Sequence, residues 1–310
     1  MKNEEINLSV QIGKLILKNP VMPASGTFGY GKEFSEFLDI NQLGAIVVKS
    51  ITLNPRLGSF ENRFIEIGGC SFISNIGLQN VGVERFIKEK LPFLRQFNTP
   101  IIVSIAGDSM DEYLRVAEKL NMQEGISALQ LNLTCPNTEK GGMIFAADSK
   151  ITFNIIKKMK NITDLPIIPK LLPTKIDIKT LAKICVEAGA DGIRPSAGRV
   201  GMSIDIITKK SKLRKNLTGA LGGPSLKPIA LRMVWEVTQT VDIPVIGGGG
   251  ITCVNDALEF FIVGATAIEV GSYNFINPRV TIEIINGIKK YLIDNGIKRI
   301  IDIIGTIESS

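Results

Sequence analysis

Short, mainly apolar runs recur along the chain, and longer amphipathic stretches lie between them. Eight of the runs have strand length, at residues 20–23, 45–48, 101–105, 128–131, 167–171, 190–193, 243–246 and 267–270. Uninterrupted apolar strands are typical of parallel sheets that are covered on both faces. The intervening segments 110–120, 177–188 and 256–263 have the spacing of helices that bury one face. The pattern therefore predicts repeated βα units.

Eight βα units in a chain of 310 residues predict an α/β fold, the (β/α)8 TIM barrel. No Pro-, Gly- or Ser-rich linker divides the sequence, so residues 1–310 are expected to form a single domain. An open doubly wound sheet is the alternative, and it is disfavoured because no glycine-rich loop dominates the first βα turn. Two spans, 51–95 and 199–227, exceed ordinary βα loops and are where lids and substrate contacts are expected.

Composition and charge exclude several classes of protein. The net charge is +6 with only 6% aromatic residues, and the densest basic run, 208–215, is interpreted as a solvated loop, so no nucleic-acid partner is expected. No apolar run reaches the ~18 residues of a membrane span, and the N-terminus lacks a secretory h-region, so a cytoplasmic location with no membrane partner is the expectation. The chain has no histidine and no CxxC pair among its four cysteines. No metal site, Ser-His-Asp triad or Cys-His pair is therefore expected.

Polar residues follow several of the predicted strands. The carboxyl ends of barrel strands meet at one face, and that face carries function. Ser25 follows the first strand, Lys49 and Ser50 the second, Asn132 the fourth, and Lys170 ends the fifth. A lysine at such a position needs a partner, which could be an electron-rich ligand such as a reduced flavin, or an acidic residue at the barrel mouth.

Glycines follow the last two strands, at 247–250 and at Gly271 before Ser272. Consecutive glycines let backbone N–H groups approach an anion closely, and the next helix N-terminus adds a favourable dipole. A tight, crowded turn is the alternative for the glycine run alone. The two ends together predict a phosphate site.

Cys135 lies between Asn132 and Asn137 in a Cys-Pro turn. A thiol can act as a general acid or base when its pKa moves towards neutrality, although most lone cysteines are inert. Cys70, Cys185 and Cys253 have no comparable polar neighbours and are interpreted as inert. Cys135 is therefore the candidate proton-transfer residue.

Long motifs run through nearly the whole chain: NPVMPASGTFGYG (19–31), GAIVVKSITLNPR (44–56), IGLQN (76–80), NLTCPNTEKGG (132–142) and GGPSLKPIALRMV (222–234). With them the chain resembles the class 1 dihydroorotate dehydrogenases, and most closely the catalytic subunit of the 1B type. The resemblance implies a (β/α)8 barrel that binds FMN at the strand carboxyl ends and converts dihydroorotate to orotate in pyrimidine biosynthesis. It also implies a homodimer core and a separate subunit that carries FAD and a 2Fe–2S cluster and passes electrons to NAD.

Residue by residue, the resemblance implies three groups of contacts. The flavin ring would be lined by Ser25, Lys49, Ser50, Asn132 and Lys170, and the ribityl phosphate would be held by Gly223, Gly249, Gly250, Gly271 and Ser272. Cys135 would take the proton from C5 of the substrate while hydride leaves C6 for flavin N5. The substrate would be bound by Lys49, Asn75, Ile76, Gly77, Leu78, Asn132 and Asn137.

The chain departs from the family pattern on the substrate side. Ser74, Ala197 and Gly198 stand where the family has Asn, Asn and Thr, Ser104 replaces a common Asn beside the flavin, and arginines occur at 194 and 199. Each hydrogen bond to the substrate that is lost in this way weakens its binding by roughly 0.5–1.5 kcal/mol. Arg194 or Arg199 is a candidate for binding an anionic group, and the alternative is that both arginines point to solvent or pair with acidic residues. An FMN enzyme that acts on another small acid or enone-type C=C bond is the second functional hypothesis, and a flavin-binding barrel without turnover is the third.

Overall fold

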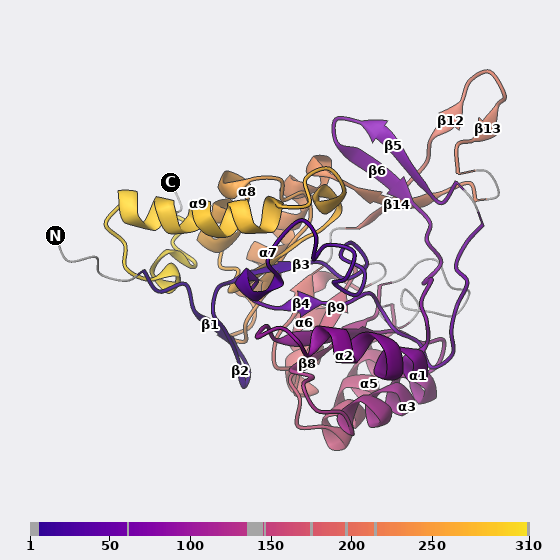
Figure 1. Ribbon diagram of the computed structural model, residues 1–310, viewed down its shortest axis with the longest axis horizontal. Coiled ribbons are helices and arrows are strands. Elements are labelled where there is room, and N and C mark those ends of the chain that lie inside the picture. Colours follow the sequence, from indigo (N-terminus) through magenta and orange to yellow (C-terminus); the bar gives the residue numbers. More distant parts are fainter. Residues whose placement is uncertain are drawn as a thin grey trace.

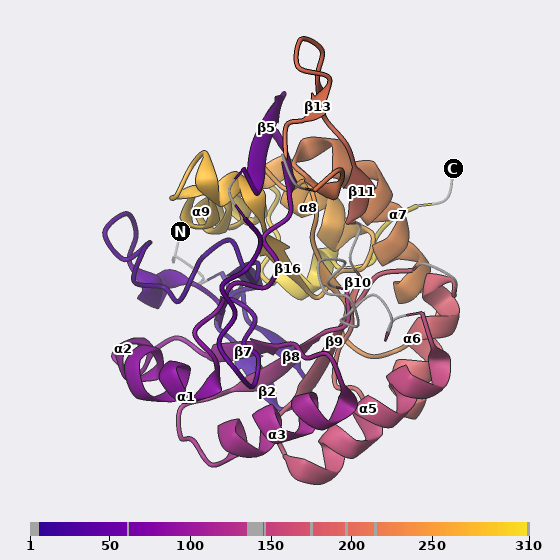
Figure 2. The ribbon, with the colours of Figure 1, turned by 90° about the vertical axis from the view of Figure 1, so that its right-hand side faces the viewer.

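The computed structural model describes residues 6–60, 62–134, 145, 147–173, 176–195, 198–213 and 216–308. Its centre consists of parallel strands in two sheets, of which one has five strands in the order β10-β9-β8-β7-β4 and the other has three in the order β15-β16-β3. The helices surround these strands in Figure 2. The strands are β3 (Val21–Pro23), β4 (Ile46–Val47), β7 (Ile101–Ile105), β8 (Ala128–Asn132), β9 (Ile167–Leu171), β10 (Arg194–Pro195), β15 (Ile246–Gly247) and β16 (Ala267–Val270).

Backbone contacts join the two parallel sheets at both of their edges. At one edge Ile193 and Val245 form a parallel bridge, and the amide of Ile246 donates to the carbonyl of Ile193 over 2.8 Å. At the other edge the amide of Gly44 donates to the carbonyl of Val21 over 3.0 Å. The strands thus curl around a shared interior, as in an α/β fold of the TIM-barrel type.

Six of the eight apolar runs coincide with parallel strands, but the sixth and seventh predictions were displaced. Runs 190–193 and 243–246 were expected to be strands, whereas the ladders are formed by Arg194–Pro195 and Ile246–Gly247. Pro244 has no N–H to donate to a ladder, and only its carbonyl is used, by the amide of Ile193. Backbone pairing therefore begins at the last residues of these two runs, with the bridge between Ile193 and Val245, and the ladders lie just after it.

The helices begin where the sequence supplies a capping side chain. Ser109 accepts a hydrogen bond from the amide of Glu112 at the start of α3 (Met110–Asn121), and Asp177 caps α6 (Ile178–Glu187). These two helices and α8 (Val254–Ile262) confirm the amphipathic pattern. The remaining helices are α1 (Val83–Arg85), the π-helix Phe86–Lys90, α2 (Leu91–Leu94), α5 (Ser149–Ile162), α7 (Lys227–Thr238) and α9 (Val280–Asp294). None of the helices in the described ranges is long and apolar enough to cross a membrane.

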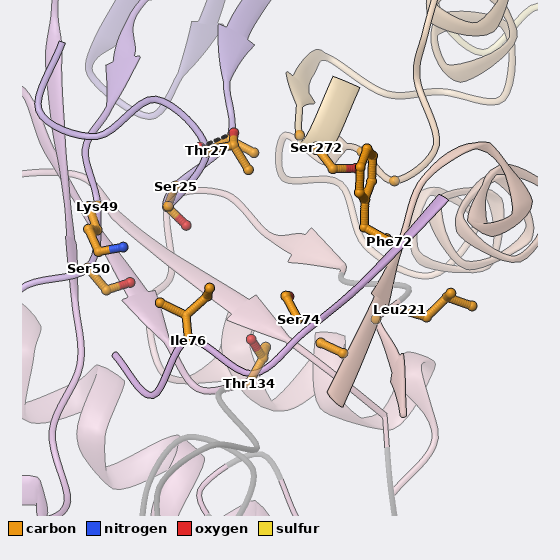
Figure 3. A pocket seen from close by; sticks show the side chains of 18 of the residues that line it. Ser25, Thr27, Lys49, Ser50, Phe72, Ser74, Ile76, Thr134, Leu221 and Ser272 are labelled. Atoms are coloured by element: carbon orange, nitrogen blue, oxygen red, sulfur yellow. Dashed lines mark hydrogen bonds between the residues drawn. The ribbon is translucent and has the colours of Figure 1, made fainter. Parts of the chain in front are cut away.

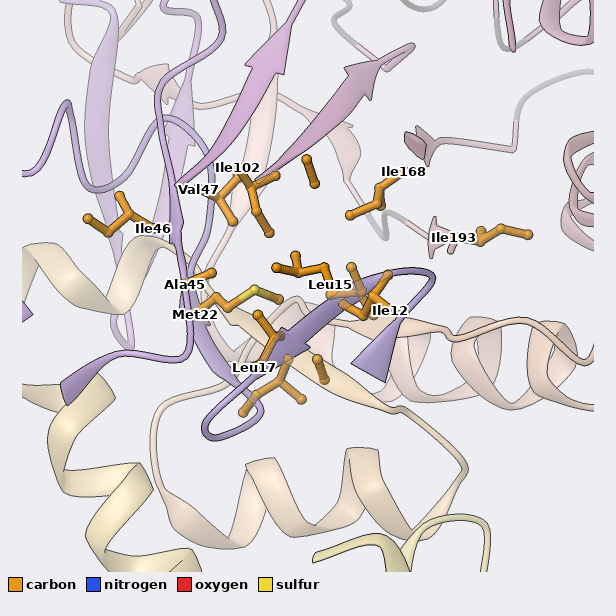
Figure 4. Packing of buried hydrophobic residues seen from close by; sticks show 14 of the residues in the cluster. Ile12, Leu15, Leu17, Met22, Ala45, Ile46, Val47, Ile102, Ile168 and Ile193 are labelled. Atoms are coloured by element: carbon orange, nitrogen blue, oxygen red, sulfur yellow. The ribbon is translucent and has the colours of Figure 1, made fainter. Parts of the chain in front are cut away.

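A hairpin closes the amino-terminal end of the parallel strands. Its strands, β1 (Val10–Ile12) and β2 (Leu15–Leu17), alternate buried and exposed residues. Figure 4 shows Ile12, Leu15 and Leu17 pointing into the same apolar cluster as Met22 and Ile168. Because this end is filled by packed side chains, the opposite end is the one open to a ligand.

The two long spans meet in an antiparallel sheet over that opposite end. Its strand order is β11 (Arg199–Gly201), β14 (Gly219–Gly222), β6 (Ser71–Ser74) and β5 (Phe64–Gly68). Ser74 lies opposite Ala220 in the register. A second hairpin, β12 (Ile204–Asp205) and β13 (Lys210–Ser211), extends beyond it (Figure 1). The sequence predicted lids in these spans, but it predicted none of these strands.

Candidate active site

A cavity of about 810 Å³ lies between the carboxyl ends of the parallel strands and the antiparallel sheet. Its wall includes every residue expected from the sequence to hold the flavin ring or the phosphate. Figure 3 shows Ser25, Lys49, Ser50, Thr134 and Ser272 around this space, with Ser74 and Leu221 on the antiparallel sheet. The ten residues are Ser25, Lys49, Ser50, Asn132, Lys170, Gly223, Gly249, Gly250, Gly271 and Ser272. The structure brings them together, and what they bind stays a prediction.

Asn132 is fixed at the cavity wall by hydrogen bonds on both sides of its amide. Its Nδ2 donates to the Ser50 hydroxyl over 3.0 Å, and its Oδ1 accepts from the Thr134 hydroxyl at 2.9 Å. Ser50 in turn shares a 2.8 Å hydrogen bond with Ser104, which is fully buried. Ser104 therefore supports the wall from behind and does not line the cavity. The hydrogen bonds on both sides hold the Asn132 amide in one orientation, as a preorganised binding site requires.

Lys49 is a half-buried cation on the cavity wall, and its backbone amide donates to the Gly29 carbonyl over 3.0 Å. Burial lowers its pKa below the usual 10.5, the nearby positive charge of Arg63 lowers it further, and Glu33 partly offsets both. Arg63 also lines the cavity, and the sequence analysis missed it. Glu33 lines the same cavity and is an acidic neighbour of Lys49 at the barrel mouth. The two cations outnumber it, which makes this part of the wall favourable for an anionic ligand.

Lys170 extends from β9 towards the first strand. Its ammonium donates to the Ser25 hydroxyl over 3.3 Å, which joins the ends of β9 and β3 across the cavity wall. The hydroxyl contact orients the ammonium without removing its charge.

The glycines form a backbone cradle on the cavity wall. A Cβ on Gly223 would lie 2.6 Å from the carbonyl oxygen of Cys70, and its φ of +111° disfavours any other residue. A Cβ on Gly250 (φ +77°) would lie 2.6 Å from the amide nitrogen of Lys227. Only glycine therefore fits at these two positions. Because no side chain covers the backbone there, its N–H groups can be reached by an anion.

The antiparallel sheet adds an aromatic and aliphatic wall that the sequence analysis missed. Phe64 packs against Phe72 with ring centroids 4.9 Å apart, and against Phe275 in an edge-on contact at 5.3 Å. All three rings line the cavity, together with Leu221. The only sequence signal for this wall was the unusual length of the two spans. Its apolar surface can exclude water from the end of the cavity above the strands.

The structure places some of the predicted substrate-binding residues at the cavity wall and others away from it. Ile76 and Leu78 line the cavity, whereas Asn75 and Gly77 are not part of its described wall. Asn75 holds the loop from behind, since its Nδ2 donates to the carbonyl of Thr218 and its Oδ1 accepts from Ser59. Cys135 and Asn137 lie outside the described residues, although Thr134, immediately before Cys135, is on the cavity wall.

The positions that depart from the family pattern also face this cavity. Ser74 and Gly198 line it, and Ala197 lies outside the described residues. Arg194 is buried and paired with Glu269, with its Nε 3.1 Å from Oε2, so the pairing alternative is correct for this residue. Arg199 is exposed and lines the cavity rim.

The fold and the cavity define an α/β enzyme of the TIM-barrel type, with a preorganised ligand site at the carboxyl ends of its strands. The sequence model of the family described as Dihydroorotate dehydrogenase matches residues 7–292, and the chain belongs to that family. It is therefore an oxidoreductase of the kind that acts on the CH–CH bond of dihydroorotate.

Individual relatives agree with this assignment. The chain is 49% identical over 301 residues to "Dihydroorotate dehydrogenase B (NAD(+)), catalytic subunit" of Thermodesulfovibrio yellowstonii, covering 97% of this chain and 99% of that protein. It is 46% identical over 303 residues to the protein of the same name from Thermoanaerobacter pseudethanolicus, covering 98% and 99%. A crystal structure of dihydroorotate dehydrogenase from Eimeria tenella in complex with ferulenol superposes with a TM-score of 0.79 at 21% identity, over 99% of this chain and 90% of that one. This last likeness concerns the fold.

Proposed function

We propose that the protein oxidises dihydroorotate to orotate with FMN bound in the 810 Å³ cavity, and that its eight parallel strands close a complete (β/α)8 barrel. One observation carries the proposal: all ten residues expected at the flavin line one cavity. The volume lies within the roughly 300–1,000 Å³ of typical cofactor and ligand pockets.

The residues present fit FMN. The cradle at Gly223, Gly249 and Gly250, whose close packing leaves no room for a Cβ at two of its positions, would hold the phosphate with Gly271 and Ser272. Ser25, Lys49, Ser50, Asn132 and Lys170 would hold the ring. When bound, FMN supplies the acceptor for the hydride that leaves C6 of dihydroorotate.

The chain's own residues then bind the acid and move the proton. The positive charges of Lys49 and Arg63 attract the substrate carboxylate, and Ile76 and Leu78 pack beside the ring. Cys135 takes the proton from C5, which requires its thiolate form. The rings of Phe64 and Phe72 keep water from the reacting atoms.

A separate electron-transfer subunit would complete the enzyme. The relatives are named catalytic subunits of a B-type, NAD(+) enzyme, which implies a second subunit for them. We extend this to the present chain, with FAD and a 2Fe–2S cluster on that subunit and a homodimer of this chain at the core.

Anaerobic bleaching of the flavin absorbance by dihydroorotate tests the proposal. The wild type should bleach rapidly, the Cys135→Ser variant slowly, and the Cys253→Ser variant at the wild-type rate, because Cys253 is exposed at the start of α8. Purified protein without FMN would overturn the cofactor assignment.

A second outcome would favour the other functional hypothesis. Bound FMN that dihydroorotate does not bleach, but that another small acid or an enone oxidises after chemical reduction, would assign the cavity to that substrate. This outcome is worth measuring because Ser74 and Gly198, which stand where the family has Asn and Thr, both line the cavity.

A further inference from the structure

An ion pair crosses the interior at the floor of the cavity. Nε of Arg194, on β10, lies 3.1 Å from Oε2 of Glu269, on β16. The side-chain amide of Gln130, on β8, donates to the other carboxylate oxygen, and Nη1 of Arg194 donates to the carbonyl of Pro195 over 2.6 Å. A buried network thus connects three of the parallel strands.

Stability alone does not account for this network. Barrel interiors are usually filled by branched apolar side chains. A buried ion pair gives little or no stability relative to apolar residues of similar volume, because both charges lose their hydration. Glu269 is fully buried and Arg194 is 5% exposed, so both charges have lost most of theirs.

The pair is oriented with its cation towards the cavity. Arg194 is part of the cavity wall, whereas Glu269 is not. Nη2 of Arg194 lies 2.6 Å from the place where Gly248 would carry a Cβ, so the guanidinium rests against the glycine run. Arg194 is also the register partner of Lys170 on the neighbouring strand. Arg194 therefore adds a positive charge to this wall, and its own carboxylate partner lies outside the wall.

We propose that the Arg194–Glu269 pair sets the reduction potential of the cofactor that the cavity binds, with Arg194 raising it and Glu269 limiting the rise. The proposal rests on the proposed function, since it requires bound FMN. A reduced flavin gains negative charge, so a positive potential at the wall favours the reduced form. The effect is strong because the low dielectric of the interior screens it weakly. Arg194 acts here as a positioning and electrostatic residue and takes part in no bond change.

The midpoint potential of the bound flavin, measured against a reference dye in anaerobic titrations, tests the proposal. Arg194→Gln should lower the potential and Glu269→Gln should raise it. A ten-fold change in the ratio of reduced to oxidised flavin, equal to about 30 mV for two electrons, is the expected size. The double variant should return close to the wild type, and Arg194→Lys, which keeps the charge, should change it least.

Shifts of the midpoint potential in opposite directions in the two single variants distinguish this electrostatic role from a structural one. Loss of packing would weaken flavin binding in both single variants and would not move their potentials in opposite directions. Shifts of the same sign, or no shift in either variant, would overturn the proposal. If one variant fails to fold, the direction of the potential shift in the other variant still tests the proposal. A wild type that binds no FMN would instead refute the proposed function.

Discussion

The side-chain amide of Asn132 donates to the hydroxyl of Ser50 over 3.0 Å, and this contact joins the ends of β8 and β4 at the cavity wall. The same amide accepts from Thr134, the residue immediately before Cys135. Asn132 therefore connects the expected flavin site with the beginning of the segment that carries the expected proton acceptor.

Removing this amide should weaken flavin binding. Asn132→Ala removes an expected hydrogen bond to the flavin, worth about 0.5–1.5 kcal/mol, and loosens the wall that Ser50 and Thr134 help to hold, so we expect the Kd for FMN to rise roughly ten-fold. Fluorescence titration of the flavin-free protein measures it. Asn295→Ala, at an exposed residue far along the chain in the turn after α9, is the control and should bind FMN as the wild type does. An unchanged Kd in Asn132→Ala would contradict this role.

The glycine cradle provides a matched pair of variants. Gly250 and Gly296 both have positive φ, of +77° and +68°, but only Gly250 has neighbours that a Cβ would overlap. Alanine at Gly296 should cost only backbone strain, on the order of 1–3 kcal/mol. Alanine at Gly250 should cost more, because Lys227 must also move, and it should reduce FMN affinity. Thermal unfolding and FMN titration of both variants provide the comparison; equal losses would argue against a crowded cradle.

The lowered pKa of Lys49 makes stability depend on pH in a defined direction. Burial and Arg63 disfavour its charged form in the folded protein, so the unfolded chain binds the proton more tightly. This penalty is present at neutral pH and is relieved as pH rises through the folded pKa towards 10.5. Lys49→Met should therefore raise the Tm of the flavin-free protein at neutral pH while weakening the binding of anionic substrate. The advantage in Tm should shrink at alkaline pH, and a constant difference across the range would refute the assignment.

Asp256 connects the two helices that flank the glycine run. It accepts from Nζ of Lys227 at 2.7 Å and from the amide of Thr252 at 2.8 Å. Burial acts to raise the pKa of Asp256, but these contacts outweigh it and hold the pKa below 3.8. Its contribution to stability is therefore present above that pH and is lost as pH falls through the folded pKa.

Asp256→Asn should consequently lower stability at neutral pH by about 1–3 kcal/mol, since Lys227 loses a charged partner. The difference from the wild type should diminish in acid. Urea unfolding at several pH values measures it, and Asp294→Asn, in the exposed i,i+4 pair with Lys290, is the control with little expected effect. A loss of equal size in both variants would show that the contact is ordinary surface pairing.

The parallel strands and the residues at their ends were predictable from local sequence, because a buried strand is a short apolar run and the polar residues that follow such runs lie at the same end of the sheet. The run Ile101–Ile105 is apolar except for Ser104 and is buried throughout. The polar residues after such runs, Lys49 and Ser50 among them, must meet at one end. The place of Ser104 was not predictable in detail: it stands where the family has an Asn beside the flavin, and in the structure it bonds Ser50 from behind the cavity wall. Whether a side chain at a strand end faces the cavity or a neighbour depends on packing that the local sequence does not contain.

The antiparallel sheet was not predictable by the same rule. β5 is exposed along most of its length, so it lacks the alternation that indicates a strand. Its partner β6 pairs with β14, which lies well over a hundred residues later in the chain. Arg63 and Phe72 on the cavity wall were missed for this reason, because their placement depends on pairing between remote segments.

The pairing of Ser74 with Ala220 also limits how substrate preference can change during evolution or in the laboratory. A Cβ on Gly219 would lie 2.7 Å from the carbonyl oxygen of Ser74, so neither span can be reshaped without displacing the other. Replacing only one of the two spans with that of a relative would pair strands whose sequences did not evolve together. Exchange of residues 51–95 and 199–227 as a unit keeps the inherited match between them, so the heritable unit of specificity in this protein is a pair of segments.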